Sequence, residues 1–549
     1  MERAETAEST LPAWHDAFTA EAGVKAESQA TLRRSDLVRQ PAVGAVAPSS
    51  VSLSIVEACD DDLSRARTAR RRLARAWSAV LSFDIEQGQA LTLSAERGLG
   101  GGGAPGSRIL RDEIAALRAA SLAIRDEGFA ALLAVRTIME SRSSGIAARI
   151  AFTIARLGYW KLGDLDRVLT FGRPSARAED GGQHVLLTIL DLTLDAAVEA
   201  DLLRYPAALR LATDALAMAE DRFGRGASVA ALPASVIAQI LYDGGYLDEA
   251  ESVLTPRLEA IRQASYVDCA LRAFPTLARI ASHRGQVEFA ALILQEAEAL
   301  GERRGWVRLV AASLLERLHI LARRGRLREA RVCVDRLDRL AAHTQPDAFV
   351  QSEVRRLAAM GRCRFMIAAG LHESAPVLRQ LHAEAIARRD LSLAFRLQLE
   401  LAEALENDGR VDEALQILME VLRTASGAGL YQAFRDGGPG MDRLLRRLRD
   451  QPGALAEPYL PYLVSLGRTP SQGLSKQPAR TGVRSCSNIS DRERAILRLI
   501  AQGYSNKRIA QSLTISPETV KSHAKHIFAK LAAGNRAEAV SKAEGLGLI

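Results

Sequence analysis

Hydrophobic residues recur every three or four positions through most of the chain, which is typical of amphipathic helices, and short breaks interrupt them at intervals. In the clearest breaks a Gly is followed two positions later by an apolar residue and five positions later by Ala. These breaks begin at Gly245, Gly285, Gly325 and Gly409, and degenerate copies begin at Gly163, Leu203 and Gly370. We expect the Gly to end one helix in a left-handed turn and the small residue to let the next helix pack closely.

Successive breaks lie 40, 42, 40, 40, 45 and 39 residues apart. A period near forty indicates stacked helix pairs that bury their apolar faces on one another. The predicted fold class is therefore all-α, with a TPR-like α-solenoid of helical pairs over residues 128–465. Such solenoids present a concave surface, which implies a small-molecule or protein effector bound there. A single long helical bundle is the competing interpretation.

The segments around the repeats are less regular. Residues 1–50 show no sustained apolar stripe and are predicted to form a mobile arm. Residues 51–127 are predicted to be a helical region of undetermined role, with a Gly-rich loop at 98–106 because consecutive glycines cost too much backbone entropy in a helix. Residues 466–488, rich in Ser, Gly, Gln and Pro, are predicted to be a basic flexible linker.

Residues 489–549 carry the signals of four short helices. A capping box at Ser490–Glu493 opens the first helix, and Ser505 caps a second over Asn506–Leu513. Ser516 caps a third, and Asn535 caps a fourth that ends near Gly545. The apolar positions predicted to be buried are Ile496, Leu497, Ile500, Ile509, Ala510, Leu513, Val520, Ala524, Ile527, Phe528, Leu531, Ala539, Val540 and Ala543. The opposite face of the third helix carries Lys521, Ser522, Lys525 and Ala529. Two helices joined by a tight turn indicate a helix-turn-helix, whose reading helix would present these small and cationic side chains to a DNA major groove.

Composition and charge agree with this division. The 48% hydrophobic content excludes wholesale disorder, and 5% aromatic residues argue against a β-rich fold. The five cysteines include no C-x-x-C pair, so neither a disulfide framework nor a zinc site is expected. The chain has a net charge of +8, yet residues 468–549 alone hold 14 Lys or Arg against 5 acidic residues. A basic end on a near-neutral body predicts a module that binds a polyanion.

The C-terminal residues 489–549 resemble the DNA-binding domain of LuxR-type regulators, also called NarL or GerE type. The matching residues are Arg492-Glu493, Gly503-Tyr504-Ser505-Asn506-Lys507, Ile509-Ala510, Leu513-Thr514-Ile515-Ser516, Thr519-Val520-Lys521, His523, Lys530-Leu531 and Arg536-Ala537-Glu538-Ala539-Val540. Ala495 and Arg508 depart from the family, which usually has acids there. The preceding repeats resemble those of large MalT-like regulators of the same family, although the chain shows no counterpart of their ATPase module.

The resemblance implies a fold, partners and site residues. Lys521, Ser522 and Lys525 would face the bases or the groove, and Asn506, Lys507, Thr519 and Arg536 would contact phosphates. The implied partners are double-stranded DNA, a second copy of the chain packed through the fourth helix, an effector on the repeats, and RNA polymerase. The implied function is a sequence-specific transcriptional regulator of a bacterial cytoplasm, with no cofactor and no bound metal.

Other functions compete with this interpretation. A protein-interaction scaffold whose DNA binding only tethers it remains the alternative. A response regulator would need a receiver domain with a distal Lys, but no Lys stands between Lys25 and Lys161. The Gly run ending at Gly106 lacks the Lys-Ser/Thr of a phosphate-binding loop, and no nucleophile elbow, H-E-x-x-H or dinucleotide fingerprint is present, so an enzyme is not expected.

The longest uncharged apolar stretch is too short for a membrane span and contains Pro233, so no membrane association is expected either.

Overall fold

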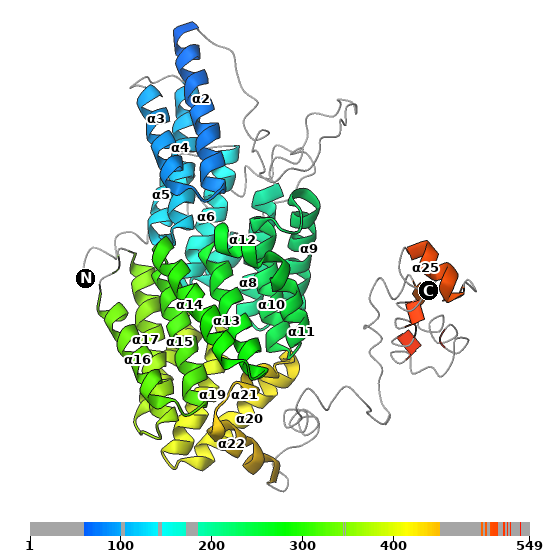
Figure 1. Ribbon diagram of the computed structural model, residues 1–549. Coiled ribbons are helices and arrows are strands. Elements are labelled where there is room, and N and C mark those ends of the chain that lie inside the picture. Colours follow the sequence, from blue (N-terminus) through cyan, green and yellow to red (C-terminus); the bar gives the residue numbers. More distant parts are fainter. Residues whose placement is uncertain are drawn as a thin grey trace. The chain divides into compact units, whose positions relative to one another are not determined.

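The computed structural model of the chain divides into two units, residues 1–468 and 469–549 (Figure 1). It describes residues 60–99, 105–140, 145–171, 185–343, 345 and 347–450 of the first unit. In the second unit it describes residues 496–497, 500–501, 505–513, 520–521, 524, 527–528 and 539. The predicted arm at 1–50 and the predicted linker at 466–488 lie outside these residues.

The described part of the first unit is built from helices alone. Its first helices are α2 (Asp60–Leu81), α3 (Ile85–Leu99), α4 (Pro105–Ile124), α5 (Gly128–Glu140), α6 (Ile146–Leu162), α7 (Leu165–Thr170), α8 (Val185–Asp201) and α9 (Tyr205–Phe223). The middle helices are α10 (Ser228–Asp243), α11 (Leu247–Leu254), η2 (Thr255–Arg257), α12 (Leu258–Gln263), α13 (Val267–His283), α14 (Val287–Arg304), α15 (Val307–Arg323) and α16 (Leu327–Ala342). The last are α17 (Ala348–Ala368), α18 (Ser374–Ala387), α19 (Leu391–Asn407), α20 (Val411–Ala428), α21 (Gln432–Arg435) and α22 (Pro439–Asp450).

Consecutive helices pack as antiparallel pairs, such as α13 with α14. Each pair stacks on the next because a helix also contacts the second helix after it, as α13 contacts α15. Figure 1 shows this series running from the blue helix α2 to the yellow helices α19 and α20. The predicted all-α solenoid is confirmed, and the single long bundle is not what the chain forms.

The predicted breaks have the expected geometry. The glycines that begin them all have left-handed backbones, from φ 66° at Gly370 to φ 84° at Gly245. Leu203 takes the same conformation, with φ 58°, although it carries a side chain. The small residue five positions after each break is fully or almost fully buried; these residues are Val168, Ala208, Ala250, Ala290, Ala330, Ala375 and Ala414. The left-handed residue therefore marks where one helix ends, and the small residue marks where the next helix packs against its neighbours.

The loop predicted at 98–106 is longer than the break between α3 and α4. Gly98 belongs to the last turn of α3, and Gly106 lies in the first turn of α4; residues 100–104 lie outside the described part. Pro105 begins α4 because the first helical position needs no backbone N–H and suits the fixed φ of proline. A run of glycines therefore does not by itself set where the flanking helices stop.

The series also returns on itself. The backbone N–H of Phe129 donates to the Asp347 carboxylate at 2.8 Å, and Arg388 Nη2 donates to the carbonyl of Lys161 at 2.9 Å. Further along, the backbone N–H of Tyr431 donates to the carbonyl of Asp243 at 2.9 Å. Helices about two hundred residues apart are thus neighbours, so the interior of the series is lined by both halves of it.

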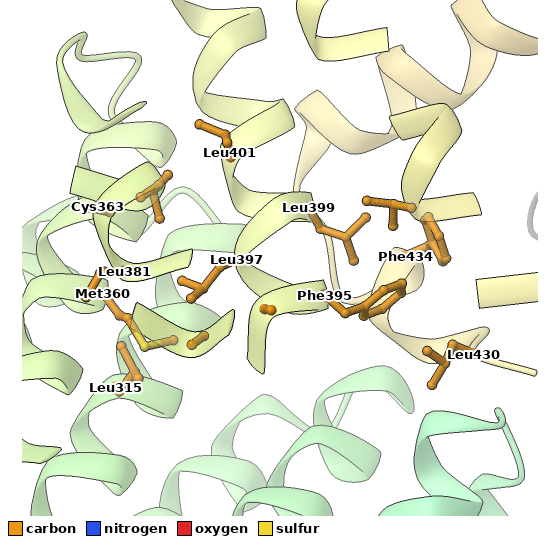
Figure 2. Close-up of a cluster of buried hydrophobic side chains, with 14 of the residues drawn as sticks. Leu315, Met360, Cys363, Leu381, Phe395, Leu397, Leu399, Leu401, Leu430 and Phe434 are labelled. Carbon is orange, nitrogen blue, oxygen red and sulfur yellow. The ribbon is translucent and has the colours of Figure 1, made fainter. Parts of the chain in front are cut away.

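The largest core cluster joins α8–α10 to α15–α22 and consists mainly of Leu and Ala (Figure 2). Phe395 on α19 meets Phe434 on α21 edge to face, with ring centroids 5.9 Å apart, and both side chains are buried. Aromatic pairs of this geometry stabilise beyond the area they bury. This contact attaches the short α21 to the last long helices.

Gly301 should resist substitution although it lies inside α14. A Cβ added there would stand 2.7 Å from Val310 Cγ2 and 3.1 Å from the Trp306 carbonyl oxygen. We expect Gly301→Ala to destabilise the fold by about 1–3 kcal/mol, because the backbone beside it cannot retreat. The matched control is Gly427→Ala in α20, where a Cβ meets nothing within 4 Å; that change should stabilise by about 0.5–1 kcal/mol. Urea unfolding of both variants measures their free energies of unfolding. An equal change in the two variants would contradict the prediction.

No helix in the described ranges is long and apolar enough to cross a membrane.

Candidate functional site

The second unit contains α25 (Asn506–Leu513), with the bounds predicted from the sequence. Ser505 begins it as expected, since its Oγ accepts from the backbone N–H of Arg508 at 3.4 Å and its carbonyl accepts from the N–H of Ile509 at 2.9 Å. Asn506, a predicted phosphate contact, is half-buried at the first position of this helix. Lys507 follows it in the helix, and its side chain lies outside the described part.

The described positions of the third predicted helix include its apolar stripe and one residue of its opposite face. Val520, Ala524 and Ile527 are helical and buried, whereas Lys521 is helical and exposed. The other predicted core positions that the structure describes are also buried, except Phe528, which is half-buried; the buried ones are Ile496, Leu497, Ile500, Ile509, Ala510 and Ala539. A cation therefore stands on the outer side of a helix whose inner side is fixed in a small apolar core.

The remaining predicted DNA contacts lie outside the described residues; they are Thr519, Ser522, Lys525 and Arg536. Their roles stay predictions.

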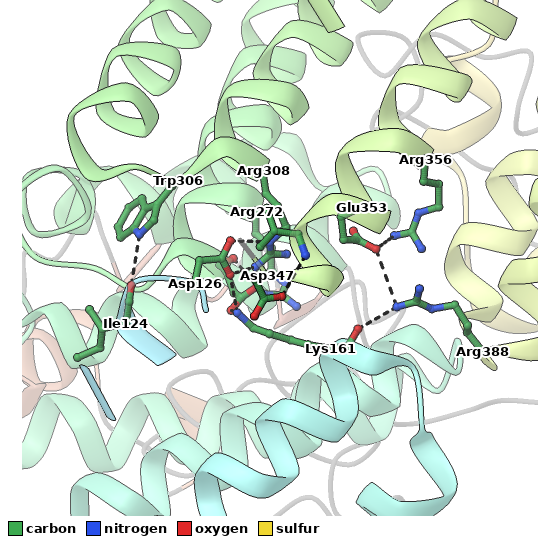
Figure 3. Close-up of polar contacts among 12 residues, drawn as sticks. Ile124, Asp126, Lys161, Arg272, Trp306, Arg308, Asp347, Glu353, Arg356 and Arg388 are labelled. Carbon is green, nitrogen blue, oxygen red and sulfur yellow. Dashed lines mark hydrogen bonds and ion pairs between the residues drawn. The ribbon is translucent and has the colours of Figure 1, made fainter. Parts of the chain in front are cut away.

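The interior of the first unit holds a buried network of charges, which the sequence did not reveal (Figure 3). Arg308, on α15, donates through Nε and Nη2 to both oxygens of Asp126, at 2.7 and 2.6 Å. Lys161 Nζ, at the end of α6, donates to the same carboxylate at 2.7 Å. Asp268 of α13 lies 3.0 Å from Arg308 Nη2 and 3.4 Å from Lys161 Nζ. Two carboxylates and two cations from four separate helical segments thus neutralise one another away from water.

The environment of this network fixes its ionisation. Burial alone would raise the pKa values of Asp126 and Asp268, but Arg308 and Lys161 outweigh it and hold both below the usual range. The Phe349 ring covers the cations, with its centroid 4.8 Å from Arg308 Cζ and 5.8 Å from Lys161 Nζ. The network therefore remains charged and joins α4 and α6 to α13, α15 and α17.

A second cluster joins the middle of the series to its end. The Asp436 carboxylate, after α21, accepts from Tyr242 Oη at 2.8 Å and lies 2.7 Å from His283 Nε2. Asp243 accepts from Tyr205 Oη at 2.8 Å and pairs with Arg396 of α19 at 2.8 Å. Both clusters lie between helices far apart in sequence, so the repeats are held by polar contacts as well as by their apolar faces.

Glu403 gives a pH-dependent prediction. Its Oε1 accepts from the backbone N–H groups of Gly438 and Met441, both at 2.8 Å, yet burial raises its pKa to about 7. A carboxyl whose pKa is raised stabilises the fold below its ordinary pKa near 4.5, and this stability is lost as the pH rises through 7.

We therefore expect Glu403→Gln to match the wild type at pH 4.5 and to exceed it by about 1–3 kcal/mol at pH 8. Urea unfolding of both proteins at the two pH values measures this difference. A constant gap between them would contradict the prediction.

Beside the network lies an apolar cavity of about 180 Å³, lined by α2, α4, α6, α8, α10 and α13. Asp268 and Arg272 are the charged side chains in its wall, and Trp160 lies both in this wall and in that of an adjoining polar cavity of about 160 Å³. The repeat pattern predicts an effector on the solenoid, but it does not single out any of these residues. In the sequence each of these residues is an ordinary position of its own helix, and only the packing of distant helices places them around one cavity.

Two family models match the chain. "MalT-like TPR region" matches residues 112–451, and "Bacterial regulatory proteins, luxR family" matches residues 487–543. The first covers more than half of the 549 residues.

Curated relatives agree with these matches over part of their length. The HTH-type transcriptional regulator MalT of Cronobacter sakazakii is 30% identical over 36% of this chain and 23% of its own length. MalT of Vibrio cholerae is 26% identical over 56% of this chain and 35% of its own length. The chain thus aligns with about a quarter to a third of these relatives.

A similar fold is found in a solved structure of a Rap protein. The Rap protein, crystallised in complex with the competence and sporulation factor, aligns with a TM-score of 0.51 at 15% identity, covering 66% of this chain and 99% of the Rap chain. That likeness concerns the helical fold alone. The matched residues show that the chain belongs to the proteins with a MalT-like TPR region and carries a LuxR-family helix-turn-helix domain at its C-terminal end.

Proposed function

We propose that the protein is a sequence-specific DNA-binding transcriptional regulator of the LuxR family, acting in the bacterial cytoplasm. The observation that carries the proposal is the exposed Lys521 on a helix whose other face, at Val520, Ala524 and Ile527, is buried. A helix held in this way can enter a major groove and present its cation to base edges or phosphates. The LuxR-family match over residues 487–543 supports the same role.

The proposed reading surface adds the side chains given by the family resemblance. Ser522 and Lys525 join Lys521 in facing the groove. Asn506, Lys507, Thr519 and Arg536 contact the phosphates on either side. A second copy of the chain, packed through the fourth helix, would read the other half of an inverted repeat, and RNA polymerase is the partner through which binding would act on transcription.

The helical repeats are the proposed input. Their interior contains an apolar cavity next to a buried charge network, and ligand sites typically combine a concave apolar surface with a few placed polar groups. An effector bound there would contact α2, α4, α6, α8, α10 and α13 at once, beside the network that joins α4 and α6 to α15. Its binding energy could therefore change how the repeats restrain the C-terminal domain.

The test is selection of bound sequences from a random duplex pool, run in parallel on the full chain and on residues 486–549. Enrichment of one two-fold-symmetric site by both proteins supports a dimeric regulator. Enrichment by the fragment alone supports a regulator whose repeats restrain it until the effector arrives. Enrichment by neither refutes the proposal and favours the interaction scaffold.

Salt dependence separates groove binding from weak association. Each phosphate neutralised should add about 0.9 to the slope of log affinity against log salt concentration. A slope near zero for the selected duplex would count against the proposed phosphate contacts.

A further inference from the structure

The apolar cavity has walls that offer almost nothing polar to a ligand. Its two threonines donate their hydroxyls to the carbonyls one turn back, Thr153 to Arg149 at 3.3 Å and Thr193 to Ile189 at 2.7 Å. The indole N–H of Trp77 donates to Glu113 at 3.2 Å, and that of Trp160 donates to Asp201 at 2.7 Å. Most of the remaining wall is Ala, Leu, Ile and Val. At about 180 Å³ the space exceeds the ~150 Å³ at which an apolar cavity holds benzene.

The exception is the start of α13. Arg272 donates through Nη1 to the carbonyl of Asp268 at 3.0 Å, and its Cζ lies 5.5 Å from the Trp160 ring centroid. Among the described residues it forms no ion pair with any carboxylate. Tyr266 also lines the cavity, and its hydroxyl has no hydrogen-bond partner in the described part of the chain.

Asp268 attracts Arg272 but does not form a direct ion pair with it, since Arg272 donates to its main-chain carbonyl. Its carboxylate is taken by Arg308 and Lys161, at 3.0 and 3.4 Å, and Arg308 and Lys161 also hold Asp126. The Asp201 carboxyl also lies near Arg272, but it accepts from the indole N–H of Trp160 at 2.7 Å and is not in an ion pair with Arg272. Among the described residues the Arg272 guanidinium therefore has no carboxylate in direct contact, at the polar end of an apolar cavity where such a charge is costly.

We propose that this cavity binds an apolar monocarboxylic acid, with its hydrocarbon body among α2, α4, α6 and α8 and its carboxylate on Arg272, assisted by the Tyr266 hydroxyl. A guanidinium binds a carboxylate through two parallel N–H donors, which suits the donors that Arg272 has left. The acid would be the effector of the proposed function, so its regulatory meaning rests on that function. Its binding does not, because binding can be measured without DNA.

The test is isothermal titration of the full chain with hexanoate, octanoate, decanoate and 3-phenylpropanoate, which separate an alkyl from an aryl body. Octanol and octylamine are the head-group controls. We expect one equivalent of at least one acid to bind, and binding of octylamine to be undetectable. Arg272→Gln should weaken the acid about 10- to 100-fold and leave octanol unchanged.

Two further variants keep the test decisive. Arg284→Gln, at the end of the same helix, removes an arginine paired with Glu251 and Asp248 away from the cavity, and should bind like the wild type. Ala123→Leu fills the cavity from α4 and should weaken acid and alcohol alike without loss of thermal stability.

The proposal is overturned if no acid binds, if acid and alcohol bind equally, or if Arg272→Gln leaves the acid affinity unchanged. If the acid binds as expected but neither it nor Arg272→Gln alters binding to the selected duplex, the proposed regulatory function fails and the site stands.

Discussion

Replacing Lys521 with Ala is expected to lower the affinity for the selected duplex by about 1–3 kcal/mol, or about 5- to 150-fold. The Lys521 side chain is exposed, whereas Val520 and Ala524, in the same turn of the helix, are buried. The helix should therefore keep its place, since exposed substitutions usually change stability by less than about 0.5 kcal/mol. Fluorescence anisotropy with the selected duplex, at two salt concentrations, measures the loss.

The salt dependence distinguishes what Lys521 contacts. If it binds a phosphate, Lys521→Ala should reduce the log-log slope by about one and weaken all sequences alike. If it reads a base, the discrimination between the selected site and a mutated one should fall instead.

Arg508→Ala is the matched control, because Arg508 is an exposed cation on α25 at a position where the family usually has an acid. It should bind nearly like the wild type. Equal affinity of Lys521→Ala and the wild type would show that this helix is not the reading helix.

The helix boundaries could be predicted because their signals are local. Gly245, Gly285 and Gly325 each supply a left-handed turn at the position where it is needed, and Ser505 supplies an oxygen to the first turn of α25. The stripe of Val520, Ala524 and Ile527 is likewise a property of one helix. Period and domain order then suffice for the solenoid and the helix-turn-helix.

The interior could not be predicted because it depends on contacts between distant segments. Asp126 and Arg308 stand 182 positions apart, and each looks like a solvated charge on its own helix. Arg272 and Trp160 face one cavity only because α6 and α13 meet there. Periodicity shows which face of a helix is buried, but not which helix of a later pair will cover it.

Replacing Arg308 with Met should be among the most destabilising single changes in the repeats. Its side chain is 7% exposed and donates three hydrogen bonds to Asp126 and Asp268. Without it both carboxylates would share Lys161 alone, and removing one partner of a buried ion pair costs about 3–5 kcal/mol. Urea unfolding measures the loss of stability. Hydrogen exchange should show faster opening of α4 and α6, because the arginine joins them to α15.

Arg362→Met provides the contrast, since Arg362 pairs with Asp338 where both side chains are at least 40% exposed. An exposed pair contributes about 0–1 kcal/mol, so this variant should unfold nearly like the wild type. The double variant Arg308→Met with Asp126→Leu removes one of the stranded carboxylates and should recover part of the loss. If Arg308→Met cost no more than Arg362→Met, the buried network would not hold the two halves of the series together. The repeats would then depend on their apolar faces alone.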